Sequence, residues 1–316
     1  MRENTFKDIA DYIVTRRSEA GFSQESLALK LAAYNTLFEN LDSLTISRWE
    51  RGKVSPNIVR QVSLMEFFND QPQQLLCDAA FELKQLPSID SFFKMIDQQL
   101  NYNHLMGAHP YISQDTISFD KLTKNADEAE NMYGWIANYH TNLTKGREVW
   151  SKDFIKSLAN VDSTEVTFYL VNGLLAGHIF IIKVSEATFD ALSTNQLTDQ
   201  QLTHEHLIQA HEPGCLYMLS TYLGGKHVTE DFLSHLLLTL AETENNIAFG
   251  YKARSDIGVK LMDFLSGEVV DLGDTLQEKM DGAKYQGKRR SYVSFKLSRQ
   301  SLISSSLFLN LTRNCS

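Results

Sequence analysis

A short segment near the N-terminus concentrates side chains that donate hydrogen bonds. Residues 44–53 read LTISRWERGK and hold two arginines, one lysine, one threonine and one serine. Arginine can donate two hydrogen bonds to guanine O6 and N7, while serine and threonine can bond to bases or phosphates. These residue types at this spacing indicate contacts with double-stranded DNA.

Short helices would have to position these side chains. The spacing predicts a helix over Leu44–Arg51 that ends at Gly52, with Ile46 and Trp49 on its inward face. The basic edge then points outward, and a helix of this kind fits a major groove roughly 12 Å wide. Ser23 is a predicted N-cap of a preceding helix. Together with a helix over Phe6–Arg17 and another from about Asn57, these segments predict a compact all-α module.

The segments GFSQESLA (21–28) and LTISRWERGK (44–53), with Pro56 after them, resemble the Cro/repressor-type (XRE) helix-turn-helix family. The resemblance implies a sequence-specific transcription regulator that binds DNA as a homodimer, with recognition helices roughly 34 Å apart. The DNA-binding residues that it implies are Arg17, Ser23, Gln24, Glu25, Leu44, Thr45, Ser47, Arg48, Arg51 and Lys53. The stretch between Leu31 and Leu44 is longer than the family's usual turn and suggests an extra helical turn. The alternative is a small helical bundle in which the arginines are only solvated.

The charge of the chain is unevenly distributed. The chain has 316 residues, 30 Lys+Arg against 39 Asp+Glu, and a net charge of −9. Residues 1–70 hold 9 basic and 10 acidic side chains, so most of the acidity lies beyond residue 70. A nearly neutral N-terminal segment with clustered arginines is compatible with a DNA surface, whereas the acidic whole argues against nonspecific adhesion to DNA.

Three segments follow from the distribution of helices and strands. We predict a helix-turn-helix domain over 1–70, a helical linker over 71–114 with helices at 73–86 and 91–100, and an α/β domain over 115–316. In the last, Asn172-Gly173 between apolar runs predicts a β-hairpin. Consecutive strands followed by alternating strands and helices predict a mixed sheet. The fold class is thus all-α followed by α/β. The predicted strands of the second part span 116–121, 165–171, 174–184, 215–222, 247–252, 268–272 and 292–297. Its predicted helices span 127–142, 149–159, 229–242 and 258–264.

The order of elements over 115–298 resembles the GNAT acyltransferase fold. The resemblance implies that a glycine-rich loop after the fourth strand would hold the pyrophosphate of acyl-CoA, which makes Gly224, Gly225 and Lys226 candidate cofactor-binding residues. Glu230 and Asp231 would add repulsive charge at that helix start.

The catalytic residues that the GNAT resemblance implies are missing from the sequence. The strand over 215–222 has no carboxylate for a general base, and the expected tyrosine maps near Met262, with Tyr251 as a substitute. We therefore predict that this domain is not an enzyme and has no resident cofactor, and that it senses a small-molecule effector or mediates dimerisation. Two alternatives stay open: a DNA-tethered acyl-CoA-dependent N-acetyltransferase, and a repressor that acts chiefly through a protein partner.

Metal, disulfide and membrane chemistry are not predicted. The three cysteines form no CxxC pair, which fits a reducing cytosol, and no apolar run approaches the roughly 20 residues of a membrane span. We expect a cytoplasmic protein without membrane contact. His204, His206, His211 and Cys215 lack a standard zinc spacing and read as solvated surface, as does the basic run over 288–290.

Overall fold

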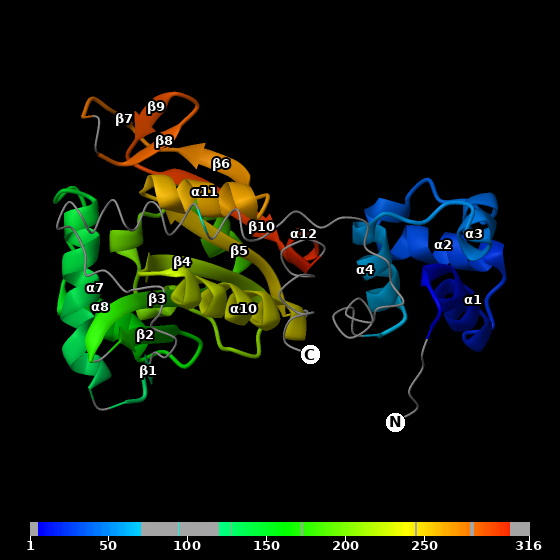
Figure 1. The fold of residues 1–316 in the computed structure, drawn as a ribbon, viewed down its shortest axis with the longest axis horizontal. Helices are drawn as coiled ribbons and strands as arrows, with labels where there is room; N and C mark the ends of the chain where they lie inside the picture. The colour runs from blue at the N-terminus through cyan, green and yellow to red at the C-terminus, as the bar shows by residue number, and fades with distance from the viewer. Residues whose placement is uncertain are drawn as a thin grey trace. The chain divides into compact units, whose positions relative to one another are not determined.

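The computed structural model describes residues 6–70, 94, 120–126, 128–171, 173–243, 245–278 and 281–303. The chain falls into two compact units, residues 1–87 with 300–316 and residues 88–299 (Figure 1). Apart from Lys94, the predicted linker helices at 73–86 and 91–100 lie outside the described residues, as do residues 116–119 of the first predicted strand.

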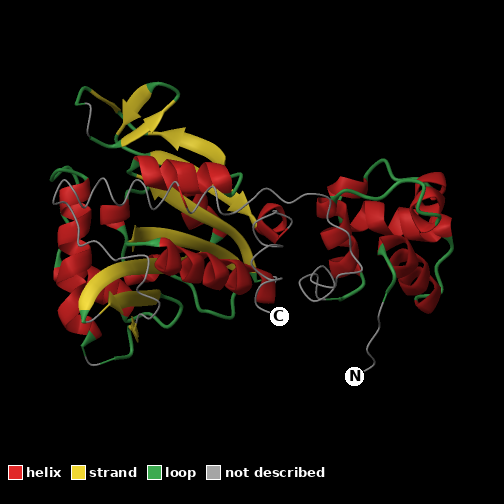
Figure 2. Ribbon diagram, in the orientation of Figure 1, coloured by secondary structure: helices red, strands yellow, loops and turns green. Residues whose placement is uncertain are grey.

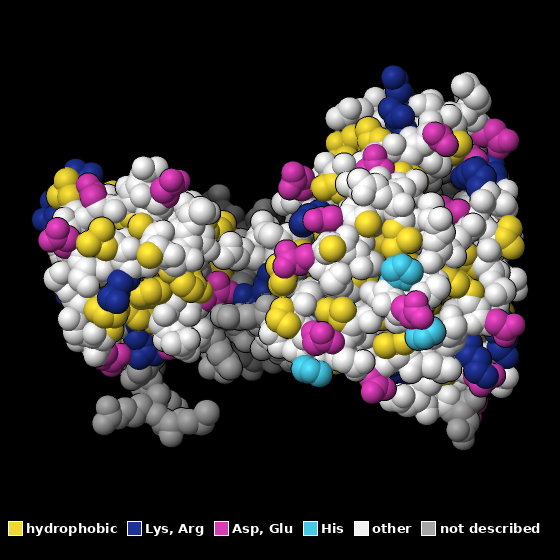
Figure 3. Space-filling view, turned by 180° about the vertical axis from the view of Figure 1, so that it is seen from behind, with side chains coloured by type: hydrophobic (Ala, Val, Ile, Leu, Met, Phe, Trp, Pro, Cys, Tyr) yellow, Lys and Arg dark blue, Asp and Glu magenta, His cyan; other side chains and the backbone are white. Residues whose placement is uncertain are grey.

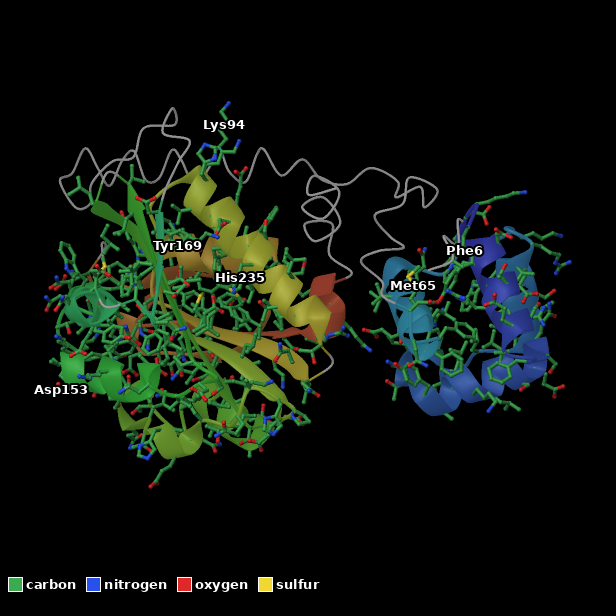
Figure 4. The ribbon with its side chains drawn as sticks, turned by 90° about the horizontal axis from the view of Figure 1, so that it is seen from below. Phe6, Met65, Lys94, Asp153, Tyr169 and His235 are labelled. Atoms are coloured by element: carbon green, nitrogen blue, oxygen red, sulfur yellow. The ribbon has the colours of Figure 1, made fainter. Side chains whose placement is uncertain are left out.

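The N-terminal unit consists of short helices that begin at side-chain caps. Its elements are α1 (Ile9–Glu19), α2 (Gln24–Tyr34), the 3-10 helix η1 (Thr36–Phe38), α3 (Ser43–Glu50) and α4 (Ile58–Phe67). The N-cap side chains of Asp8, Ser23, Asp42 and Asn57 each accept a hydrogen bond from a backbone N–H in the first turn. Phe6 and Met65 come from opposite ends of this unit's sequence and are both buried in its core (Figure 4).

The predicted helices and the extra turn of this unit are confirmed. Helix α3 begins one residue earlier than expected because Asp42 Oδ1 accepts a hydrogen bond from Thr45 N at 2.7 Å. Gly52 follows the helix with φ of 63°, a conformation that favours glycine. The 3-10 helix η1 supplies the turn predicted between α2 and α3.

The C-terminal unit is built on a seven-stranded mixed sheet of order β1-β2-β3-β4-β5-β10-β6 (Figure 2). Only β4 and β5 pair in parallel; the other neighbours are antiparallel. The strands are β1 (Asp120–Thr123), β2 (Glu165–Val171), β3 (Leu174–Val184), β4 (Gly214–Leu223), β5 (Asn246–Ala253), β6 (Glu268–Leu272) and β10 (Val293–Ser298). The predicted mixed sheet and the hairpin at Gly173 are therefore confirmed.

Helices cover both faces of the large sheet. One face packs against α7 (Ala129–Leu143), α8 (Lys152–Ala159) and α9 (Glu186–Ser193), whose apolar side chains share one core cluster with β2, β3 and β4. The other face packs against α10 (Lys226–Glu242) and α11 (Asp256–Phe264), which contact β5. Among the described residues, no helix is long and apolar enough to cross a membrane.

Several elements were not expected from the sequence. No element is predicted between the strands over 174–184 and 215–222, because the apolar pattern of α9 is short. The structure has α9 there, together with the 3-10 helices η2 (Asp199–Gln201) and η3 (His204–His206). The strands β7 (Thr275–Leu276), β8 (Ala283–Tyr285) and β9 (Lys288–Arg290) form a small second sheet of order β7-β9-β8. The basic run over 288–290, which is predicted as solvated surface, is thus itself a short strand. The remaining described segment, α12 (Arg299–Ile303), follows β10.

Candidate functional site

Helix α3 presents the predicted basic edge on the surface of the N-terminal unit. Ile46 and Trp49 are 0% and 2% exposed, so the inward face is as predicted. The side chains of Arg48, Arg51 and Lys53 are exposed. The Arg51 guanidinium Nε donates to the backbone oxygen at position 47 at 3.0 Å, which holds its stem against the end of the helix. The basic edge of α3 is therefore exposed on the surface of this unit.

The polar residues of α3 are more shielded than its arginines. Thr45 and Ser47 are half-buried, whereas Leu44 is exposed. Ser23 Oγ accepts a hydrogen bond from Ser26 N at 3.0 Å and caps α2, and Glu25 is exposed in the first turn of that helix. Three of the predicted DNA-binding residues, Ser23, Gln24 and Glu25, thus lie at the start of α2. The others, apart from Arg17 in α1, lie on α3 or in the turn after it.

Glu50 joins α1, α2 and α3 through its carboxylate. It forms an ion pair with Arg17 and accepts a hydrogen bond from Gln24 Nε2 at 2.6 Å. Arg17 Nη1 also donates to the backbone oxygen of Phe22 at 2.8 Å. We call Arg17, Gln24 and Glu50 the Glu50 cluster. In it, Arg17 and Gln24 hold α3 in place, a structural role that sequence reasoning did not assign to them. The DNA contacts predicted for Arg17 and Gln24 stay predictions.

In the C-terminal unit, β4 and β5 separate after pairing over part of their length. Their parallel register runs from Gly214 opposite Asn246 to Met218 opposite Tyr251, yet β4 continues to Leu223. On its other side, β4 has an irregularity against β3, which leaves Leu219 without a partner residue. Such a bulge bends the strand and increases its twist. The bend fits the divergence of β4 from β5.

A pocket of about 690 Å³ lies where the two strands have diverged. Helix α7, strands β3, β4 and β5, and helix α11 all contribute to its wall. The lining side chains are mostly aliphatic or aromatic. They belong to Trp135, Asn138, Tyr139, Asn142, Leu143, Leu174, Leu175, His178, Thr221, Tyr222, Leu223, Tyr251, Ser255, Ile257 and Leu261, with Gly258 between them. We refer to this cavity as the β4–β5 pocket.

The titratable groups of the β4–β5 pocket are neutral near pH 7. Burial lowers the pKa of His178 from 6.5 to about 3, and its Nε2 lies 2.8 Å from Ser220 Oγ. Burial also raises the pKa values of Tyr222 and Tyr251 to about 12, and it raises the pKa of Tyr139. A histidine with so low a pKa is a weak general base at neutral pH. The pocket is therefore better suited to binding than to proton abstraction.

Gly224 and Gly225 join β4 to α10 and have different structural roles. A Cβ atom on Gly224 would lie 1.8 Å from the backbone oxygen of Ala176 in β3, so close packing requires glycine there. A Cβ atom on Gly225 would meet nothing within 4 Å. Gly225 is the N-cap of α10 and supplies no side-chain cap. Backbone N–H groups at such a helix start can bind an anion, as the resemblance implies.

The acidic residues at the start of α10 are paired. Glu230 lies 3.7 Å from Lys226 Nζ and 3.3 Å from His227 Nδ1, measured from its carboxylate oxygens. Asp231 pairs with Lys121 Nζ at 2.5 Å and accepts a hydrogen bond from the Tyr169 hydroxyl at 3.0 Å. The expected repulsion of a bound phosphate is therefore weaker than the sequence indicated.

A second ion pair, between His235 of α10 and Glu165 of β2, lies near Asp231. Tyr169 and His235 are both labelled in this region (Figure 4). His235 Nε2 pairs with Glu165 Oε1 at 2.7 Å, and this hydrogen bond raises the pKa of His235. His235 lies partly exposed on α10 with this acidic partner.

A buried ionic network holds the end of β5 against the α7 side of the unit. Arg254 Nη2 pairs with Asp199 Oδ2 at 2.6 Å and with Glu148 Oε2 at 2.9 Å. Lys252 Nζ lies 3.3 Å from Asp199 Oδ1, and His140 Nε2 lies 2.7 Å from Glu148 Oε2. Burial acts to raise the pKa of Asp199, but Lys252 and Arg254 outweigh it, so the pKa lies below its usual value. Sequence reasoning missed this network because its members are far apart in the chain.

The histidine and cysteine cluster does not form a metal site. Among the described residues, no group of three or more His, Cys, Asp or Glu side chains could hold a metal ion. His206 Nδ1 instead accepts a hydrogen bond from Thr203 N at 3.1 Å, and Cys215 is buried, which raises its pKa to about 11. On the face shown in Figure 3, histidines are separate spots among acidic and apolar side chains.

Comparisons with known proteins gave matches among solved structures alone. No protein-family profile and no curated protein matches the chain. An N-acetyltransferase from Staphylococcus aureus Mu50 is 8% identical, over 58% of this chain and 98% of its own, with a TM-score of 0.36. FeeM, an N-acyl amino acid synthase from uncultured soil microbes, is 11% identical over 61% and 96%, with a TM-score of 0.39. A Drosophila melanogaster polyamine N-acetyltransferase is 13% identical over 57% and 100%, with a TM-score of 0.37.

Similarity at this level assigns no activity or substrate to the chain. The class of architecture follows from the coordinates themselves. A mixed sheet in which β4 and β5 pair in parallel and then diverge, with β10 inserted between β5 and β6, agrees with the GNAT-like fold that the sequence resemblance implied. The protein is thus an all-α unit joined to a GNAT-like α/β unit.

Proposed function

We propose that the chain is a sequence-specific DNA-binding transcription regulator that acts as a homodimer. In this proposal α3 enters the major groove, and the C-terminal unit binds a small-molecule effector in the β4–β5 pocket. The observation that carries the proposal is the exposed basic edge of α3, with Arg48, Arg51 and Lys53 on a helix whose other face is buried. Arginines on such an edge can read guanine, while Lys53 can contact phosphate.

The Glu50 cluster supports this assignment electrostatically. Glu50 is the acidic residue nearest in sequence to the exposed arginines, and an unpaired carboxylate there would repel phosphates. Its carboxylate is instead paired with Arg17 and hydrogen-bonded to Gln24, and its side chain is 7% exposed. The negative charge is neutralised inside the unit, which leaves the exposed edge basic.

The effector role of the C-terminal unit rests on the chemistry of its pocket. Strand β4 contributes no carboxylate, and His178 is neutral with a pKa of about 3. A ligand can change DNA binding only if it binds the DNA-competent and incompetent states with different affinity. A largely apolar pocket can provide such differential affinity without any chemical step.

The test of DNA binding is the variant Arg48→Ala. Sequences bound by the full chain would first be selected from a random DNA pool, and affinities for the best sequence measured at fixed salt. A lost bidentate contact costs about 1–3 kcal/mol, so we expect affinity to fall by about 5- to 150-fold, with relaxed preference at one base pair. Lys7→Ala removes one exposed positive charge from the same unit and should leave the preferred sequence unchanged. Equal affinities for Arg48→Ala and Lys7→Ala would overturn the assignment.

A second candidate function is a DNA-tethered, acyl-CoA-dependent N-acetyltransferase. The observation that favours it is the start of α10, where the N–H groups after Gly225 have no side-chain cap and the nearby acids are paired. Calorimetry with acetyl-CoA, followed by an assay of CoA release with amine acceptors, separates the candidates. Amine-dependent CoA release would establish the enzyme, whereas binding without turnover would favour the regulator.

A further inference from the structure

A second cavity of the C-terminal unit lies between α10 and the strands β1, β2 and β3. Its volume is about 350 Å³, and we call it the β2–α10 pocket. Among the described residues, none lines both this pocket and the β4–β5 pocket. We propose that the β2–α10 pocket binds a small monocarboxylate with a compact apolar body. This ligand site does not depend on the function proposed above.

The carboxylates of the β2–α10 pocket already have partners. Asp231 of α10 lies 2.5 Å from Lys121 Nζ of β1 and accepts a hydrogen bond from the Tyr169 hydroxyl of β2 at 3.0 Å. Glu165 of β2 lies 2.7 Å from His235 Nε2 of α10. Tyr169 and His235 both line the pocket and are labelled in Figure 4. Because these contacts join α10 to the sheet and engage both acids, a cationic ligand would find no free carboxylate there.

Lys124 lines the same pocket and, among the described residues, hydrogen-bonds to carbonyl groups alone. Its Nζ donates to the backbone oxygen of Val161 at 2.7 Å and to that of Asp162 at 3.2 Å, which uses two of its three protons. Burial lowers the pKa of Lys124, and the charges of Asp162 and Glu165 do not outweigh this effect. A ligand carboxylate that accepted the third proton would supply the counter-charge that these carbonyl groups do not.

Thr164 offers a second hydrogen-bond donor next to Lys124. Thr164 lines the pocket and is 2% exposed, and its Oγ1 has no hydrogen-bond partner among the described residues. The backbone N–H of Thr164 donates to the Val161 oxygen at 3.0 Å, and the same oxygen accepts the hydrogen bond from Lys124 Nζ. A buried hydroxyl without a partner is unfavourable. One carboxylate could accept hydrogen bonds from both neighbours, the Thr164 hydroxyl and the Lys124 ammonium group.

The rest of the lining sets the size and polarity of the ligand. Val166, Tyr169 and Ile179 line the pocket and are each 1% exposed, so they offer an apolar surface to the body of the ligand. The volume lies near the lower end of the roughly 300–1,000 Å³ that is typical of small-molecule sites. Inorganic phosphate would leave the apolar surface uncovered, and a second carboxylate on the ligand would be repelled by Glu165 and Asp231. A small monocarboxylate satisfies all of these conditions.

The experiment is calorimetry of the full chain with benzoate as the probe. Benzamide has nearly the same shape but no charge, so we expect it to bind at least about tenfold more weakly, because hydrogen bonds to a charged group are the stronger ones. Terephthalate, which carries a second carboxylate, and inorganic phosphate, which has no apolar body, should each bind at least about tenfold more weakly than benzoate.

Two pairs of variants place the site. Thr164→Val keeps the shape of the side chain and removes the hydroxyl, whereas Ser193→Ala removes another buried hydroxyl that has no partner among the described residues and lies outside the lining. Lys124→Met removes the ammonium group, and Lys152→Met removes one from α8, also outside the lining. We expect Thr164→Val and Lys124→Met to weaken benzoate binding at least about tenfold and the two controls to leave it unchanged.

A stability measurement separates ligand binding from a structural role of Thr164. Since its hydroxyl makes no hydrogen bond with the described residues, Thr164→Val should not lower the stability of the unliganded chain in urea unfolding, although it weakens benzoate binding.

Three results would each overturn the inference: no benzoate binding at millimolar concentrations, equal affinities for benzoate and benzamide, or equal affinities of Thr164→Val and Ser193→Ala for benzoate. None of them bears on the proposed function, since DNA binding is tested by Arg48→Ala and the β4–β5 pocket by acetyl-CoA.

Discussion

The Glu50 cluster predicts a stability effect that can be located within the chain. Glu50→Gln removes the charge that neutralises Arg17 and weakens the hydrogen bond from Gln24 Nε2. Removal of one partner of a buried ion pair costs about 3–5 kcal/mol. The Arg17 side chain is 19% exposed and keeps its bond to the Phe22 carbonyl, so water and that bond offset part of the loss. We expect the N-terminal unit to lose about 2 kcal/mol of stability.

Hydrogen exchange with mass spectrometry can measure this loss at α3. A loss of about 2 kcal/mol corresponds to about 30-fold faster exchange of amides that exchange by unfolding of the unit. Peptides that cover residues 43–52 report on α3, and peptides from β3 serve as an internal reference in the C-terminal unit. Glu39→Gln removes an exposed carboxylate from the same unit and is the matched control.

A double-mutant cycle tests the physical cause. If Arg17 and Glu50 interact as the structure shows, Arg17→Met and Glu50→Gln should not be additive, and the coupling should be about 1–2 kcal/mol. If exchange at α3 in Glu50→Gln equals that in Glu39→Gln, or the two losses simply add, then the ion pair does not stabilise α3 and the reasoning is refuted.

Three further predictions concern the C-terminal unit. Gly224→Ala should destabilise the C-terminal unit by about 1–3 kcal/mol in urea unfolding, because the new Cβ would overlap the Ala176 backbone oxygen. Gly225→Ala should be tolerated, and equal effects of the two variants would contradict the packing argument. Burial lowers the pKa of His178 from 6.5 to about 3, so the unfolded state binds a proton at a higher pH than the folded state does. The stability of the unit should therefore fall as the pH drops below 6.5, by about 2 kcal/mol at pH 5. This dependence on pH should be weaker in His178→Gln. Asp199→Asn leaves Arg254 and Lys252 without their shared buried carboxylate and should cost about 3–5 kcal/mol in the same assay, and a loss below about 1 kcal/mol would show that the network is solvated.

Local sequence signals predicted most of the secondary structure. The strands over 165–171, 174–184 and 268–272 have the predicted bounds because apolar alternation and the glycine at position 173 act over a few residues. Helix α10 begins at Lys226, three residues before the predicted start. The sequence does not mark this start, because Gly225 supplies no side-chain cap. The short strands β7, β8 and β9 depend on pairing with one another and have little apolar pattern of their own.

The candidate sites were predictable to different degrees. The inward Ile46 and Trp49 and the outward Arg48 of α3 follow from helical spacing, and the structure confirms their burial and exposure. Glu50 was passed over because its role depends on two side chains that are 26 and 33 positions away in the sequence. The β4–β5 pocket likewise depends on strand divergence and on α7, which no local pattern encodes.

Thermodynamic linkage gives the last prediction, since it connects the two proposed sites without any assumption about their arrangement. If acetyl-CoA bound to the C-terminal unit changes DNA affinity by some factor, bound DNA must change acetyl-CoA affinity by the same factor. Typical coupling free energies of about 1–3 kcal/mol correspond to about 5- to 150-fold. Both factors can be measured by calorimetry on one preparation at one salt concentration. Equal factors different from one would identify the ligand as an effector. A factor of one in both directions, with both ligands bound, would show that the pocket does not regulate DNA binding.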